Sequence, residues 1–117
     1  MFLLTRFVFS AAVAVMSPVT MTGTMHVHAG RTFIIHLPYN AGTGYSWEIV
    51  KPLPQHLSVV KEAMRPQGAA MPGGPGAAIF TLRMSAPGTA HVKFVYTRPW
   101  ERGVTPAKTA VYTVDAQ

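Results

Sequence analysis

Cysteine is absent from the 117-residue sequence. Its absence excludes disulfide bonds, thiolate zinc sites, lipid-modified cysteine anchors and cysteine nucleophiles. Acidic residues are scarce as well, with four aspartates and glutamates against ten lysines and arginines and a formal net charge of +6. The few carboxylates are far apart in sequence, and we find no set of nucleophile, base and orienting group. The sequence therefore predicts a protein that is not an enzyme and that needs no cofactor.

Runs of basic residues are also lacking, although the net charge is strongly positive. The lysines and arginines are scattered singly along the chain. Nucleic-acid binding would then depend on net charge alone, without a basic patch or a recognisable motif. We expect no nucleic-acid partner.

Long hydrophobic runs are missing too, and the main apolar stretch, residues 7–16, is too short to span a bilayer comfortably. It follows Arg6, and residues 12–14 (Ala-Val-Ala) have the small-x-small form of a cleavage site. We interpret residues 1–22 as a secretory leader; a first strand or a disordered tail is the alternative. Cleavage would leave residues 23–117 as a periplasmic or secreted domain, which we expect to be monomeric and free of the membrane.

What the sequence does contain is alternation interrupted by turn residues, with ten glycines and ten prolines spread in short clusters. Apolar residues recur with a period of two in several short segments, and no segment has a convincing helical period. Trp47 shares such a face with Tyr45 and Ile49, so we expect it in the core. The pattern predicts an antiparallel β-sandwich of about seven strands, at 24–28, 31–37, 45–50, 57–60, 78–84, 90–97 and 107–114.

Three loops between these strands have unusual compositions. The first, residues 40–47, contains two glycines around a single threonine, so its backbone can approach a partner closely. The second, residues 69–76, has almost no side chains apart from Met71, and is either a flexible connector or a donor of backbone groups to a partner. The third, residues 98–103, places Trp100 among polar neighbours after a proline. Trp100 is either an exposed binding anchor or folds back on its own strand end.

These residues carry a resemblance to a known family. Asn-Ala-Gly-Thr-Gly-Tyr-Ser-Trp at 40–47, the Gly/Pro loop at 72–76 and Tyr-Thr-Arg-Pro-Trp-Glu at 96–101 resemble the three signature loops of the chagasin family, in the same order and spacing. The likeness extends from residue 24 to residue 114. The family consists of protein inhibitors of papain-like cysteine peptidases with an immunoglobulin-like β-sandwich fold.

The resemblance implies that the three loops form a wedge that fills the peptidase cleft without being cut. Thr43, with Gly42 and Gly44, would lie nearest the catalytic cysteine and histidine of the peptidase. Loop three would pack on one side of the cleft and loop two on the other. The predicted peptidase-binding residues are Asn40, Gly42, Thr43, Gly44, Tyr45, Met71, Gly73, Gly74, Gly76, Arg98, Pro99 and Trp100.

Three positions depart from the family pattern. Ala41 and Gly42 stand where the first loop usually has a proline and then a hydroxyl-bearing or small residue, and Pro75 stands where the second loop tends to have glycine. Without the proline ring, the free loop has more conformations to lose on binding. Gly42 lacks a hydroxyl, and Pro75 lacks a backbone donor. We expect weaker or narrower inhibition than the family norm.

Two other interpretations remain open at the level of sequence. His26, His28 and His36 could share an outer sheet face and bind zinc through their imidazoles, or could simply be solvated strand residues. The chain could also be an exported accessory or adhesion domain without a peptidase target, because fold does not fix function. The position of Trp100 discriminates: an inhibitor needs it exposed at the same end as Thr43.

Overall fold

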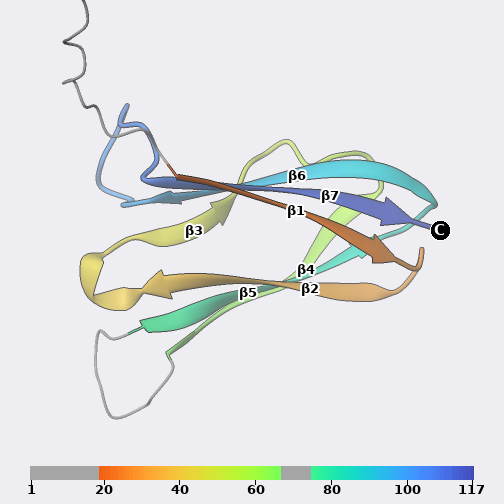
Figure 1. Ribbon diagram of the computed structural model, residues 1–117, viewed down its shortest axis with the longest axis horizontal. Coiled ribbons are helices and arrows are strands. Elements are labelled where there is room, and N and C mark those ends of the chain that lie inside the picture. Colours follow the sequence, from red (N-terminus) through yellow and green to blue (C-terminus); the bar gives the residue numbers. More distant parts are fainter. Residues whose placement is uncertain (1–18, 67–74) are drawn as a thin grey trace, which may run out of the picture.

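The computed structural model describes residues 19–66 and 75–117, and within them the chain forms seven strands in two sheets (Figure 1). One sheet has the order β1-β7-β6-β3 and the other the order β2-β5-β4. The predicted β-sandwich of about seven strands is confirmed. The strands are β1 (Val19–Val27), β2 (Thr32–Asn40), β3 (Ser46–Ile49), β4 (Leu57–Pro66), β5 (Pro75–Met84), β6 (Gly88–Thr97) and β7 (Lys108–Ala116).

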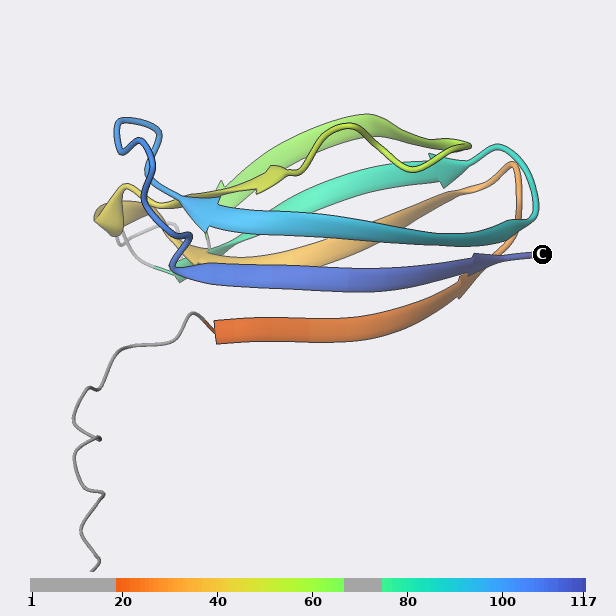
Figure 2. The ribbon, with the colours of Figure 1, turned by 90° about the horizontal axis from the view of Figure 1, so that it is seen from above.

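Alternating apolar side chains along the strands fill the space between the two sheets. Every second residue is buried from Gly76 onward in β5 and from Ala90 onward in β6, and the sheets meet where Phe80 stacks on Phe94 with ring centroids 4.8 Å apart. Trp47 is 2% exposed, as its period-two pattern predicted. Figure 1 shows the two sheets edge-on, one above the other, and Figure 2 looks onto the β1-β7-β6-β3 sheet, with the strands running along the long axis. In the described part of the chain, 19–66 and 75–117, no helix is long and apolar enough to cross a membrane.

The first strand departs from the antiparallel pattern. β1 pairs in parallel with β7, from Val19 opposite Lys108 to Val27 opposite Ala116, whereas the other strand pairs are antiparallel. β1 also takes in residues 19–22, which the sequence assigned to the leader. Residues 1–18 lie outside the described residues, so the leader and the domain boundary stay predictions.

Two predicted strand ends were wrong. β2 continues through Pro38 to Asn40, because β2 is an edge strand in which a missing N–H can be tolerated. β4 runs to Pro66 and not to residue 60, because a register shift between Val59 and Lys61 interrupts the alternation that marks a strand.

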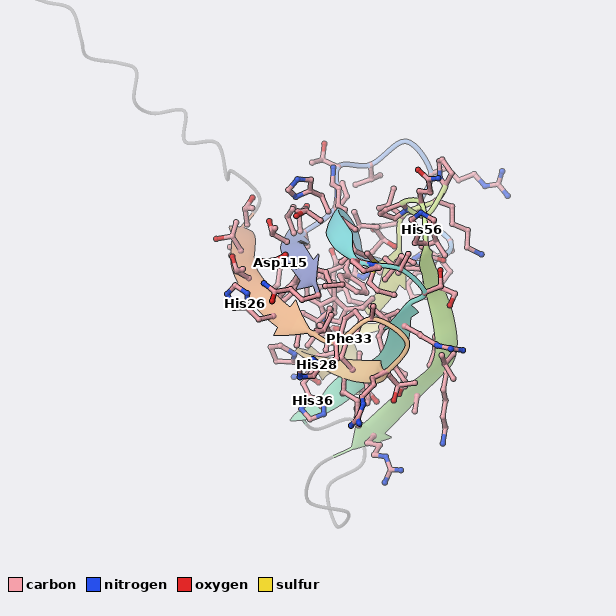
Figure 3. All side chains as sticks on the ribbon, turned by 90° about the vertical axis from the view of Figure 1, so that its right-hand side faces the viewer. His26, His28, Phe33, His36, His56 and Asp115 are labelled. Atoms are coloured by element: carbon pink, nitrogen blue, oxygen red, sulfur yellow. The ribbon has the colours of Figure 1, made fainter. Side chains whose placement is uncertain are left out.

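The proposed zinc-binding face is not formed. His26 lies on β1 and His36 on β2, which belong to different sheets, and His28 follows β1 in the turn between them (Figure 3). His26 Nδ1 lies 3.4 Å from a carboxylate oxygen of Asp115 on the neighbouring strand. Among the described side chains, no three histidine, aspartate or glutamate residues gather closely enough to hold a metal ion.

Candidate functional site

Three connections lie at one end of the sandwich, on the left of Figures 1 and 2. They are the β2–β3 connection with its 3-10 turn η2 (Ala41–Thr43), the β6–β7 connection, and the facing ends of β4 and β5. The strand register fixes the third, since Asn40 pairs with Pro75 and Pro66 pairs with Gly76. We call this region the loop end, defined by residues 40–45, 98–107, Pro66 and Pro75–Gly76.

Local hydrogen bonds shape the first loop. The Asn40 side-chain oxygen accepts from the Gly42 N–H at 3.1 Å, and the Thr43 hydroxyl donates to the Asn40 carbonyl at 2.7 Å. The same hydroxyl accepts from the Tyr45 N–H at 3.3 Å. These bonds close a tight turn that presents Gly42 and Thr43 to solvent. An asparagine and a threonine thus hold this loop without a proline.

The third loop is a tight turn over residues 98–101. The Glu101 N–H donates to the Arg98 carbonyl at 3.1 Å, and Pro99 occupies the second position, which proline favours because its φ is preset. The Arg98 guanidinium also lies 3.5 Å from the Glu101 carboxylate. At the third position the Trp100 side chain points outward, and the residue is 66% exposed.

Arg98 joins the third loop to the first. Its Nε donates to the Thr43 carbonyl at 3.1 Å, although the two residues are 55 positions apart in sequence. Its guanidinium also lies 4.4 Å from the Tyr45 ring centroid, within the range of a cation–π contact. The sequence predicted Arg98 as a peptidase contact, and the structure adds that it fixes the two loops relative to each other.

Gly44 and Trp100 fit together closely. Gly44 has a φ of +80°, and a Cβ added there would lie 2.5 Å from Cη2 of the Trp100 indole. The indole edge therefore lies against the first loop, outside the sandwich. Only glycine satisfies both the backbone conformation and this approach. The exposed indole is at the same end as Thr43, which is the arrangement an inhibitor needs.

An aromatic column supports the loop end from the core. The Tyr96 ring stacks on Tyr45 with centroids 5.1 Å apart and lies tilted against Trp47 with centroids 4.8 Å apart. The Tyr96 hydroxyl accepts from the Asn40 N–H at 3.0 Å, and the Trp47 indole N–H donates to the Pro38 carbonyl at 2.8 Å. Sequence reasoning placed Tyr96 in the strand at 90–97 but missed its role beneath the loops, because its bond to Asn40 spans 56 residues.

The second loop is placed only at its ends. Gly76 is a buried residue of β5, opposite Tyr39 on β2 and Pro66 on β4. Met71, Gly73 and Gly74 lie outside the described residues. Of the twelve predicted site residues, the structure brings together Asn40, Gly42, Thr43, Gly44, Tyr45, Gly76, Arg98, Pro99 and Trp100.

Comparison with known proteins agrees with this geometry. The chain is 29% identical over 106 residues to amoebiasin-2 of Entamoeba histolytica, covering 89% of this chain and 85% of that protein. The crystal structure of the cysteine protease inhibitor EhICP2, also from Entamoeba histolytica, is 28% identical with a TM-score of 0.66, covering 85% of this chain and 95% of that one. PbICP-C, solved in complex with falcipain-2, is 23% identical with a TM-score of 0.63, covering 86% and 91%; that likeness supports the fold alone.

The family assignment follows from a match along most of the chain. Residues 26–114 match the model of the chagasin family peptidase inhibitors, I42. The matched range contains the first loop, the third loop and the aromatic column between them. The chain therefore belongs to the chagasin family of peptidase inhibitors.

Proposed function

We propose that this protein is a reversible, non-covalent inhibitor of papain-like cysteine peptidases, whose loop end occludes the active-site cleft. The first loop would enter the centre of the cleft, and Trp100 would pack on the adjoining surface. The similarity to EhICP2, which is described as a cysteine protease inhibitor, supports the choice of target class. The family assignment supports inhibition as the activity.

The observation that carries the proposal is the position of Trp100. An indole exposed to 66% at the tip of a loop is costly in water unless a partner covers it. Here it is held by a proline turn and by contact with Gly44, so little conformational freedom is left to lose on binding. Rigid aromatic side chains of this kind dominate the energetics of binding surfaces.

The first loop is suited to occupy a cleft without reacting. The chain has no cysteine, and the Thr43 hydroxyl already donates to Asn40 and accepts from Tyr45. No base in the described part of this loop activates that hydroxyl. The hydrogen-bonded turn and Arg98 also oppose the extended conformation in which a peptidase cleaves a chain. Occlusion without covalent chemistry follows.

The test is a titration of the purified protein into papain and related cysteine peptidases with a fluorogenic peptide substrate. We expect competitive inhibition, reversal on dilution, and an inhibitor of unchanged mass after long incubation. A serine peptidase such as trypsin is the matched control and should be unaffected. Absence of inhibition across the papain-like panel at about 10 μM protein, well above ordinary inhibitor affinities, would overturn the proposal.

Export to the periplasm or outside the cell remains part of the proposal. The leader interpretation depends on residues 1–22, and the cleavage motif at residues 12–14 precedes β1. Cleavage there would leave the whole of β1 paired with β7, whereas cleavage after residue 22 would remove its first four residues. The mass of the protein recovered from the extracellular or periplasmic fraction distinguishes the two, and recovery of only full-length cytoplasmic protein would contradict export.

A further inference from the structure

The outer face of the β2-β5-β4 sheet has a hollow that the proposed function does not use. It has a volume of about 330 Å³ and lies on the outward-facing side of this sheet, not at the loop end. Its lining is mainly apolar, with cationic groups on one side. The lining residues are Ile34, His36, Lys61, Ala63, Arg65, Ile79 and Thr81.

The strand register explains why the face is concave. Ile79, on the central strand, pairs with His36 on β2 and with Ala63 on β4. Ala63 stands between Lys61 and Arg65 on the same side of β4, so a short side chain is flanked by two long ones. On the opposite edge Ile34 is 50% exposed. The face is thus a trough with an apolar floor, a cationic rim along β4, and a rim along β2 made by Ile34 and His36.

The charge of this trough has one sign. Lys61 and Arg65 form the β4 rim, and Arg83, which alternates with buried neighbours, lies on the same face farther along β5. The described outer side chains of β2, β4 and β5 include no carboxylate on this face. Glu62 projects to the other side of β4, where it lines a separate hollow with Glu48 and Lys51.

We propose that this trough binds an acidic segment of a second protein partner, with an apolar side chain seated on Ile79 between two carboxylates that pair with Lys61 and Arg65. Lys61 and Arg65 are four residues apart on one strand, which is about 13 Å. Carboxylates four positions apart in an extended segment have the same spacing, and the residue midway between them points to the same face. The expected pattern is acid-x-apolar-x-acid.

Three other occupants fit the trough less well. If the same face of a second copy packed here, cations would lie opposite cations, because the face has no carboxylate of its own among its described residues. A bilayer surface is flat and would leave the hollow empty. A nucleic acid would find cations but no phenylalanine, tyrosine or tryptophan among the lining residues, and so only the His36 imidazole on which to stack a base. The acidic protein segment matches both the charge and the apolar floor.

The trough shares no residue with the loop end, although Arg65 adjoins Pro66, and the two are tested apart because the peptide assay contains no peptidase. The probe is a fluorescein-labelled peptide with the core Glu-Ser-Leu-Ser-Glu, followed by fluorescence anisotropy with the full chain and no peptidase present. We expect saturable binding in the range of about 10–500 μM that weakens as salt is raised, as for a short charged peptide. Peptides with Gln for both Glu, or with Ser for Leu, should bind at least about tenfold more weakly.

Two double variants are compared. One carries Lys61→Glu and Arg65→Glu in the trough, and the other carries Lys51→Glu and Lys93→Glu outside its lining. All four positions are exposed, and both pairs change the net charge equally. Only the first should reduce peptide affinity, by at least about tenfold. Ala63→Leu, which fills the trough without changing charge, should do the same, and circular dichroism would verify that each variant folds.

Three results would overturn the proposal. The first is that the Gln peptide binds as tightly as the Glu peptide. The second is that both charge-reversal double variants lose the same peptide affinity, and the third is that Ala63→Leu leaves the peptide affinity unchanged. Two further probes are vesicles with about one-third phosphatidylglycerol and a single-stranded oligonucleotide. If either binds more strongly than the peptide, and the Lys61/Arg65 variant loses that binding, the face would be assigned to a lipid surface or to a nucleic acid instead. None of these outcomes bears on inhibition at the loop end, which is assayed with peptidase.

Discussion

The two tryptophans of this chain occupy opposite environments, one in the aromatic column beneath the loops and one at the surface of the loop end. Trp47 is 2% exposed, donates its indole N–H to the Pro38 carbonyl and packs on Tyr96. Trp100 is 66% exposed and contacts the first loop through Gly44. The same side chain thus stabilises the fold in one place and, by our proposal, binding in the other. The difference arises from neighbours: alternating apolar residues surround Trp47, whereas a proline turn and charged residues surround Trp100.

The largest effect is expected from Trp47→Ala. Removing a buried indole leaves a cavity in the core and an unpaired carbonyl at Pro38, at a cost of about 3–5 kcal/mol of unfolding free energy. Urea denaturation followed by circular dichroism measures this loss. A stable Trp47→Ala protein, with an unfolding free energy within about 1 kcal/mol of the parent, would contradict the structural role of this residue.

Trp100→Ala should separate binding from stability. We expect inhibition to weaken by about 1–4 kcal/mol in binding free energy, as for an aromatic anchor. The unfolding free energy should change by less than about 0.5 kcal/mol because the indole is exposed. Inhibition assays and denaturation on the same preparation test both parts. Trp100→Phe, which keeps an aromatic ring, is the control and should lose less; equal inhibition by Trp100→Ala would remove the third loop as an anchor.

Arg98→Ala tests the link between the loops. The variant loses the bond to the Thr43 carbonyl and the contact with Tyr45, so the two loops become free to move apart. We expect inhibition to weaken by about 1–2 kcal/mol, through slower association and faster dissociation of the complex. Stopped-flow and dissociation measurements give the two rates. Arg98→Lys keeps the charge without the planar guanidinium and should recover only part of the loss. Full activity of Arg98→Ala would show that the loops need no such link.

The smallest effect is expected from Ala41→Pro, which adds a stiff ring to the first loop. Residue 41 begins the 3-10 turn, whose backbone φ is compatible with proline. Fewer conformations in the free loop should tighten inhibition by about 0.4–1 kcal/mol. The inhibition constant measures the gain, and Ala41→Gly should shift it in the opposite direction. Weaker inhibition by Ala41→Pro would mean that the proline conflicts with the bound conformation.

Sequence reasoning recovered what local patterns encode. The period of two located most of the strands and the burial of Trp47, whereas polar neighbours left Trp100 either exposed or folded back on its own strand end, and the structure shows it 66% exposed. The parallel β1–β7 pair was missed because alternation does not report which strand lies alongside. The full length of β4 was missed because its register shift breaks the alternation.

Long-range contacts of the site were also beyond the sequence pattern. The bonds from Arg98 to Thr43 and from Asn40 to Tyr96 join residues more than fifty positions apart, and no local signal predicts such partners. The hollow between Lys61 and Arg65 likewise depends on which strand lies next to Ala63. The loop residues themselves were identifiable because glycine, proline and tryptophan have distinctive local effects.

The pairing of β1 with β7 bears on how the chain acquires its structure during synthesis. Val19 lies opposite Lys108, so the first strand of the domain finds its neighbour only after nearly all of the polypeptide has left the ribosome. Until then β1 has no β7 with which to pair, and the larger sheet is incomplete. A late closing step of this kind would suit a protein that has to cross a membrane before it folds.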